Sequence, residues 1–329
     1  MIAVDPSYDI TECYENGRWV KLDKFPRIPS REKVTDHQLT VANNELYIAG
    51  GVYLENFMMV NDMLDAFYVD DFYQYDRLDN QWSPLCPMMT ERSCFAMVHM
   101  NDHIYAIGGK GWLDRRQFKI LDEVECYSLQ TGFWEVVANL PVSLSAPSAV
   151  VYKDNILVYG VLGMEDYDLR TVDASLLAYD PQGDTWTQLL TEVVQNPFRE
   201  SSEKVKNYPL VLVVENNVCY RVKYVDNVAQ VNRLTLQLDN TAPYTGQLCS
   251  PHNPSDQTTL AVSRDAGPFC INKRIFVNLR GYVHRLDINV DTQVNADGVA
   301  GGCGWERINC IDSCAAACAT FTFDKYCGL

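Results

Sequence analysis

The strongest constraint in this 329-residue chain is a unit that repeats every 52 residues. Two kinds of landmark recur at this interval: Tyr75, Tyr127 and Tyr179, and likewise Trp82, Trp134 and Trp186. A period of this size is typical of repeat architectures in which each unit is one small block of secondary structure. The length alone would allow either several domains or one repeat array, and the period favours the array.

Each unit has the pattern of a four-stranded sheet. In the best copy, an apolar run (95–100) is followed by the turn pair Asn101-Asp102, a second apolar run (103–107) and the glycines Gly108-Gly109. Asn, Asp and Gly tolerate the backbone conformations that tight turns require. A third strand with the tyrosine and a fourth with the tryptophan complete the unit. Similar hairpin patterns occur at 39–51 and 149–161.

Weaker copies extend the series to the ends of the chain. Hairpin patterns recur at 210–222 and 269–277, and residues 319–327 and 10–19 each supply part of one further unit. We therefore predict an all-β fold, a six-bladed β-propeller with one blade split between the termini, which would leave no free sheet edge. The predicted blades are 30–86, 90–138, 145–190, 207–245, 266–307, and 315–329 joined with 1–22. The insert 191–208 is predicted to be a solvated excursion.

The repeat resembles the kelch motif. The double glycine, the tyrosine of the third strand and the tryptophan that follows it are all present in Gly108-Gly109, Tyr127 and Trp134, and Arg92 matches an arginine common before the first strand in that family. The segment from Pro87 to Ser93 and the split blade are similar to the BTB-kelch, or kelch-like, proteins.

This resemblance implies a non-catalytic role. In BTB-kelch proteins the propeller captures the protein to be ubiquitinated, while separate BTB and BACK domains bind a cullin. The sequence shows neither of these helical modules, and it begins inside a blade, so we expect it to be an excised propeller. Any contact with a cullin would be made by BTB and BACK domains, which this sequence does not include. The alternatives are a kelch scaffold that binds cytoskeletal proteins without degradation, and a copper oxidase with kelch blades.

Composition narrows the partners and the compartment. The net charge of −16 disfavours nucleic acid, because an acidic surface repels phosphates. No apolar run is long enough to span a bilayer, so no membrane partner is expected. The N-terminus lacks the pattern of a signal peptide, and the twelve cysteines are therefore expected to be reduced thiols in a cytoplasmic protein.

Partner binding in a propeller is expected on loops at its mouth, because the strands are used for packing. The loop 52–71 is apolar and acidic, whereas the loop 110–119 is basic and holds a tryptophan, a residue type enriched at binding hot spots. The alternatives are that the first loop buries its own apolar side chains and that the second is merely solvated. The candidate partner-binding residues are Tyr53, Phe57, Met58, Met59, Arg92, Trp112, Arg115, Arg116, Asp166, Tyr167 and Arg170.

No catalytic or cofactor site is predicted. Cys310, Cys314 and Cys318 lie among alanines and lack the paired spacing of a zinc site, so we expect buried thiols. The five histidines form no ligand pair at helical spacing, and neither a phosphate-binding loop nor a nucleophile elbow is present. We therefore expect no metal ligands and no cofactor.

Overall fold

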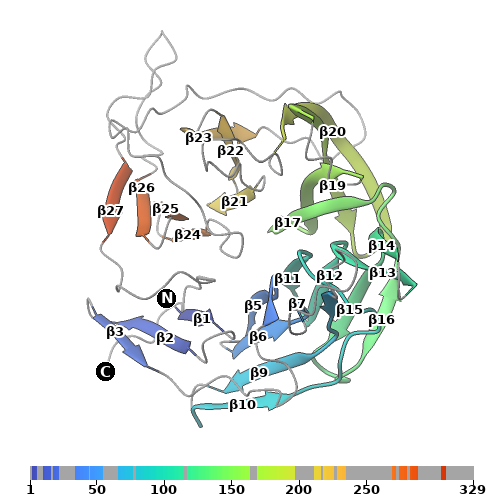
Figure 1. Cartoon of the computed structure of the whole chain (residues 1–329), viewed down its shortest axis with the longest axis vertical. Coiled ribbons are helices and arrows are strands. Elements are labelled where there is room, and N and C mark those ends of the chain that lie inside the picture. Colours follow the sequence, from blue (N-terminus) through green and yellow to red (C-terminus); the bar gives the residue numbers. More distant parts are fainter. Residues whose placement is uncertain are drawn as a thin grey trace. The chain divides into compact units, whose positions relative to one another are not determined.

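The fold consists of antiparallel β-strands, as the sequence predicts (Figure 1). The computed structural model describes residues 2–5, 10–15, 18–21, 34–43, 45–54, 66–76, 79–114, 117–163, 169–196, 211–215, 218–225, 228–234, 269–271, 274–279, 282–287 and 305–308. Within these ranges every regular element is a strand, and no helix is long and apolar enough to cross a membrane. The described residues divide into two compact units, one up to Ala146 and one from Pro147 onward.

The first unit contains two four-stranded sheets that carry the repeat. One has the order β10 (Gln81–Pro84), β9 (Phe72–Asp76), β6 (Glu45–Ala49) and β5 (Gln38–Ala42). The other has the order β11 (Ala96–Met100), β12 (His103–Ile107), β15 (Val124–Ser128) and β16 (Trp134–Val137). Both orders are simple meanders with one excursion between the second and third strands.

Three smaller sheets complete this unit. They are β1 (Ile2–Asp5), β2 (Ile10–Glu15) and β3 (Arg18–Lys21); β4 (Val34–Thr35), β7 (Val52–Leu54) and β8 (Ala66–Tyr68); and the pair β13 (Lys110–Asp114) and β14 (Gln117–Ile120). Strand β1 was not predicted. The segments 52–71 and 110–119 were predicted to be loops, but each contains a short hairpin. The first is formed by β7 and β8, and the second by β13 and β14.

The second unit repeats the same type of sheet. Its sheets are β17 (Leu144–Tyr152), β18 (Asn155–Leu162), β19 (Thr171–Asp180) and β20 (Thr185–Gln195); β21 (Val211–Glu215), β22 (Val218–Val225) and β23 (Val228–Leu234); and β24 (Phe269–Ile271), β25 (Arg274–Leu279), β26 (Tyr282–Asp287) and β27 (Trp305–Ile308). Strand β17 begins just before the division between the units.

The length of strand β20 differs from the expectation that residues 191–208 form a solvated excursion. The strand continues through Gln195, so the start of the insert 191–208 belongs to a strand and not to a solvated excursion. Val194 is buried there, which explains why the strand extends: its side chain contributes to the core of the second unit. The remainder of that insert lies outside the described residues.

The repeated tyrosines and tryptophans face one another across neighbouring strands. Tyr75 pairs with Trp82, Tyr127 with Trp134 and Tyr179 with Trp186, with ring centroids 5.1, 5.2 and 4.8 Å apart. Tyr14 and Trp19 occupy the same register on β2 and β3. Aromatic pairs across an antiparallel ladder stabilise a sheet beyond the area they bury.

These aromatic pairs also pack between sheets. Phe72 of β9 makes edge contacts with Tyr127 and Trp134, at centroid distances of 4.8 and 5.1 Å. The three rings belong to the core of the first unit. The period of the sequence therefore reflects structural packing, and the motif by itself requires no ligand.

The turn between the third and fourth strands has a repeated polar contact. The hydroxyl of Tyr75 donates to Asn80 Oδ1 at 2.5 Å, and the hydroxyl of Tyr179 donates to Asp184 Oδ1 at 2.7 Å. Asn80 and Asp184 both have positive φ, of 52° and 47°. Asn and Asp accept this conformation more readily than other side chains do, so the same two residues shape the turn and satisfy the buried tyrosine.

The described strands agree with a kelch-type β-propeller fold. Two four-stranded sheets lie within the expected ranges 30–86 and 90–138. The sheet β17–β20 begins and ends close to 145–190, and the sheet β24–β27 ends at Ile308, one residue beyond 266–307. The number of blades and their limits remain predictions. The hairpin expected at 319–327 and the cysteines Cys310, Cys314 and Cys318 lie outside the described residues.

Candidate interaction surface

Each double glycine of the first unit starts a hairpin that leaves its sheet and returns to it. In the first copy, Gly50 N–H donates to the Asp71 carbonyl at 2.9 Å, and Val69 N–H donates to the Gly51 carbonyl at 3.0 Å. These two bonds close the base of the excursion that contains β7 and β8. The chain therefore returns in register to begin β9.

The second copy is closed in the same way. Gly108 N–H donates to the Glu123 carbonyl at 3.1 Å, and Leu121 N–H donates to the Gly109 carbonyl at 2.8 Å. Gly109 has φ of +94°, and a Cβ there would lie 2.6 Å from the Ser93 carbonyl oxygen. Only glycine fits this close approach without strain, which explains the residue type at this position.

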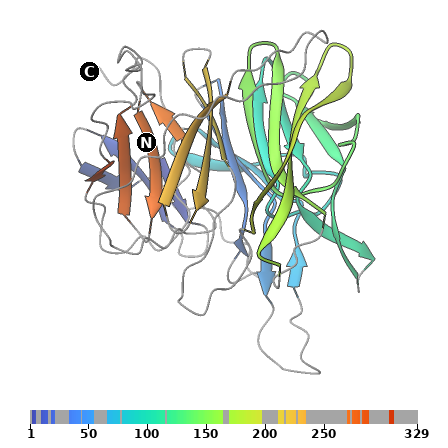
Figure 2. The same ribbon diagram turned by 90° about the horizontal axis from the view of Figure 1, so that it is seen from above.

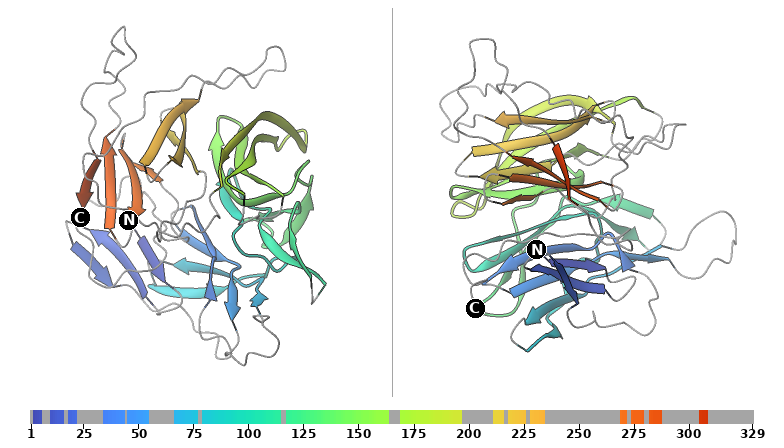
Figure 3. Two further views of the ribbon diagram at one scale, coloured as in Figure 1. Left: turned by 45° about the horizontal axis from the view of Figure 1, so that its top comes forward. Right: turned by 90° about the vertical axis from the view of Figure 1, so that its left-hand side faces the viewer.

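The two hairpins project on the same side of their sheets (Figure 2 and Figure 3). Tyr53 and Phe67 are paired across β7 and β8 with their rings stacked at 5.1 Å. Tyr68 makes an edge contact with Trp112 of β13 at 5.5 Å, which joins the two hairpins. These two aromatic pairs lie on opposite faces of β8, and we name their four residues, Tyr53, Phe67, Tyr68 and Trp112, together the hairpin surface. Phe67 is 37% exposed, and the other three side chains are half-buried.

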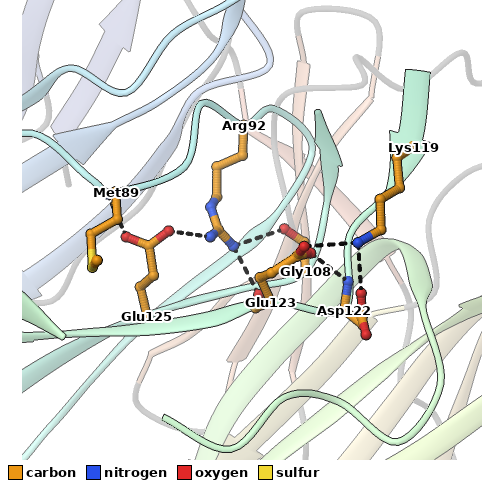
Figure 4. Close-up of polar contacts among 7 residues, drawn as sticks. All are labelled: Met89, Arg92, Gly108, Lys119, Asp122, Glu123 and Glu125. Carbon is orange, nitrogen blue, oxygen red and sulfur yellow. Dashed lines mark hydrogen bonds and ion pairs between the residues drawn. The ribbon is translucent and has the colours of Figure 1, made fainter. Parts of the chain in front are cut away.

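Arg92 lies inside the protein, beneath the second hairpin (Figure 4). Its guanidinium forms an ion pair with the buried carboxylate of Glu125 and donates from Nη1 to the carbonyls of Gly108 and Glu123, at 3.2 and 3.0 Å. The other Glu125 oxygen accepts from Met89 N–H at 2.7 Å. Burial lowers the pKa of the Arg92 guanidinium, whereas Glu125 raises it.

The main chain of Arg92 completes this junction. Its carbonyl accepts from Gly51 N–H at 2.8 Å, and its N–H donates to the Val69 carbonyl at 3.2 Å. One residue thus joins the bases of both hairpins, through its backbone on one side and its guanidinium on the other. This buried position differs from the expectation that Arg92 belongs to an exposed binding surface, because a fully covered side chain has no atom to offer a partner.

The charge of the second hairpin is partly balanced by its own neighbours. Lys119 Nζ lies 2.8 Å from Glu123 and 3.1 Å from Asp122 (Figure 4). The hydrogen bond to Glu123 is the main cause that raises the pKa of the Lys119 ammonium. These two acids lie just beyond the predicted basic loop 110–119. The basic sector is therefore weaker than the sequence predicts.

Of the remaining candidate binding residues, the structure describes only Arg170. Arg170 is exposed directly before β19 in the second unit, and its carbonyl accepts from Asn196 N–H at 3.0 Å. The candidates outside the described residues are Phe57, Met58, Met59, Arg115, Arg116, Asp166 and Tyr167.

Phe67 and Tyr68 belong to the predicted binding loop 52–71 but were not among the candidate partner-binding residues, and the structure adds them. Phe67 and Tyr68 alternate on β8, so one stacks on Tyr53 and the other reaches Trp112. The signal that could have identified them is the adjacent aromatic pair in an excursion that has strand character. The contact between the two hairpins had no local sequence signal.

Comparisons with known proteins agree with this architecture. The family model described as Kelch motif matches residues 91–141, which include Arg92, the second double glycine and the Tyr127–Trp134 pair. The chain is 37% identical over 153 residues to the Kelch repeat and BTB domain-containing protein 8 of Xenopus tropicalis, which is 46% of this chain and 22% of that protein.

Two further relatives show the same partial coverage. The chain is 31% identical over 179 residues to Kelch-like protein 36 of Mus musculus, which is 54% of this chain and 26% of the relative. It is 28% identical over 188 residues to Kelch-like protein 40 of Xenopus tropicalis, which is 57% of this chain and 27% of the relative. The chain thus matches about a quarter of the length of these curated relatives. The chain therefore contains a Kelch motif, has the antiparallel sheets and repeated Tyr–Trp pairs described above, and is similar to the kelch-like proteins.

Proposed function

We propose that this chain is a non-catalytic protein-interaction module, the substrate-recognition part of a BTB-kelch adaptor for a cullin-dependent ubiquitin ligase in the cytoplasm. The observation that carries the proposal is the hairpin surface, where two aromatic pairs, Tyr53 with Phe67 and Tyr68 with Trp112, lie on the two excursions and the Phe67 ring is exposed. The similarity to Kelch repeat and BTB domain-containing protein 8 and to kelch-like proteins supports the adaptor class.

The physical basis of binding is the combination of aromatic area and charge. Aromatic side chains bury large areas at little cost in side-chain entropy, and they are common anchors at protein interfaces. The acidic character of the chain, with 43 acids against 27 bases, favours a partner segment that carries both apolar and basic side chains. Charge complementarity at the rim would set orientation and association rate more than affinity.

The test uses affinity purification of the full-length product that contains this chain. Replacing Phe67 by Ser, or Arg115 and Arg116 by Glu, is expected to remove the partner protein while a cullin still co-purifies. Phe133→Ser is the matched control, since Phe133 is 67% exposed on a turn of the second sheet, away from the hairpin surface. Unchanged partner recovery in both hairpin variants would contradict this surface as the binding site.

The same purification distinguishes the scaffold alternative. If the chain serves as a scaffold without degradation, the partner co-purifies with no cullin, and its lifetime in the cell is unchanged when this protein is depleted. If it is an adaptor, cullin is present and depletion lengthens the partner's lifetime. A propeller oxidase would instead carry stoichiometric copper, which elemental analysis of the purified protein detects.

A further inference from the structure

Three side chains with metal-ligand chemistry lie together on the second sheet of the first unit. His103 of β12, Cys126 of β15 and Glu135 of β16 each offer one ligand atom, and these atoms all lie within 4.8 Å of one another. Among the described residues, this is the one group of at least three such side chains that comes so close. It is separate from both the hairpin surface and the Arg92 junction.

The strand register explains why the three side chains meet. Cys126 lies directly opposite Glu135 across β15 and β16, and His103 lies opposite Ser128, two residues from Cys126 on the same strand. Directly paired and alternate residues project from the same face of an antiparallel sheet. The cluster therefore lies on the face opposite to Tyr127 and Trp134, which pack into the core with Phe72.

The distances suit a metal ion after a small adjustment. Zinc bonds of about 2.0–2.3 Å in tetrahedral geometry place neighbouring ligand atoms about 3.5 Å apart. Because the three atoms lie no more than 4.8 Å apart, reaching that spacing requires each atom to move by about 1 Å or less. Three adjacent strands thus present the three ligands on a rigid base.

The ligand types favour zinc over harder cations. Thiolate and imidazole select Zn²⁺, whereas Ca²⁺ and Mg²⁺ prefer sets made only of oxygen ligands. The burial of the three groups is graded, since Cys126 is buried, His103 is half-buried and Glu135 is exposed. A metal bound here would have its sulfur ligand shielded and its carboxylate side open to a water molecule as fourth ligand.

We propose that His103, Cys126 and Glu135 form a Zn²⁺ site that links three strands of this sheet. On binding, the Cys126 thiol proton is released to solvent and the sulfur coordinates the metal as thiolate. Because the ligands come from β12, β15 and β16, the ion stabilises the sheet in its folded arrangement and binds the unfolded chain far less well.

The experiment compares metal uptake by the purified full chain and by matched variants. After removal of metal with a chelator, Zn²⁺ alone is added, and the bound metal is counted by elemental analysis. The wild type is expected to retain one zinc ion more than Cys126→Ser or His103→Gln. Cys94→Ser, which changes a half-buried thiol of the same unit outside the cluster, is expected to retain as much zinc as the wild type.

Cobalt substitution gives a readout that is specific to the sulfur ligand. The Co²⁺ form of the wild type and of Cys94→Ser should show a thiolate-to-cobalt charge-transfer band, and this band should be absent from Cys126→Ser. Equal zinc uptake and equal cobalt spectra in the wild type and Cys126→Ser would overturn the proposal, because the metal would then be bound by other cysteines.

A third variant addresses the risk that a change at a buried thiol disturbs folding. Glu135 is exposed, so Glu135→Gln is expected to leave the melting temperature of the metal-free protein unchanged. Its zinc affinity should fall about tenfold or more, since loss of a ligand costs at least as much as loss of a supporting contact. An unchanged zinc affinity in Glu135→Gln would also overturn the proposal.

Discussion

The guanidinium of Arg92, in the segment before β11, forms an ion pair with the carboxylate of Glu125 on β15, and both side chains are excluded from solvent. The two residues are 33 positions apart in the chain. The pair therefore connects the bases of the two hairpins with the interior of the second sheet. Its energetic role can be tested directly.

Removal of either charge should strongly destabilise the protein. Glu125→Gln leaves the Arg92 charge buried without its counter-ion, and Arg92→Met leaves the carboxylate in the same position. A loss of about 3–5 kcal/mol in the free energy of unfolding is expected for each. The double variant should lose less than the sum of the two single losses, because no uncompensated charge remains. Urea unfolding measures all three variants, and strictly additive losses would show that the pair is not coupled.

Trp134→Ala should also destabilise the protein, through lost packing. Trp134 is 8% exposed, contacts Phe72 and Tyr127, and donates from Nε1 to the Cys86 carbonyl at 3.0 Å. Truncation of a large buried aromatic residue costs about 3–5 kcal/mol. The equivalent change at Trp82, which is only half-buried, should cost less. Equal losses in chemical unfolding would contradict this order.

Two glycines with positive φ should respond differently to replacement by alanine. At Gly109 a Cβ would lie 2.6 Å from both Phe95 Cβ and the Ser93 carbonyl oxygen, whereas at Gly163 no atom lies within 4 Å. Gly163→Ala should cost about 1 kcal/mol for backbone strain alone. Gly109→Ala should cost roughly 2–4 kcal/mol, because overpacking is added to the strain. Melting temperatures of the two variants provide the measurement, and equal shifts would contradict the steric argument.

His37 should make stability depend on pH. Among the described residues its buried ring has no hydrogen-bond partner at either nitrogen, and burial lowers its pKa from 6.5 to about 4, with Asp36 opposing that change. Between these values the unfolded chain binds a proton that the folded chain does not, so stability falls as the pH drops from about 6.5 to about 4. The loss from this group is at most about 3.5 kcal/mol, since each unit of pKa difference corresponds to about 1.4 kcal/mol.

His37→Gln supplies the reference for that measurement. It carries no titrating ring, so the stability of the wild type relative to the variant should decrease as the pH is lowered through this window. Unfolding free energies measured at several pH values give the difference. A constant difference would mean that His37 titrates alike in the folded and unfolded chains.

The sequence predicted the repeated core well, because its signals are local. Tyr127 and Trp134 face each other across a short turn, so a spacing of a few residues already specifies the pair. The excursions were harder to predict. Both were expected to be loops, although β7–β8 and β13–β14 form strands there. Strands β7 and β8 have only three residues each, too few for an alternating pattern to indicate a strand, and Gly111 interrupts β13.

By itself, the sequence determined the class of fold and the residues that define each repeat, since alternation, turn residues and a 52-residue period are properties of neighbouring positions. Only the tertiary structure decided which distant side chains meet. Arg92 was expected to bind a partner but is buried against Glu125. The proximity of His103 and Cys126 could not be predicted from their spacing in the sequence. The meeting of His103 and Cys126 arises from strand pairing, which places residues far apart in the chain on one face of a sheet. Arg92 reaches Glu125 from outside the strands, because its backbone is hydrogen-bonded to Gly51 and Val69.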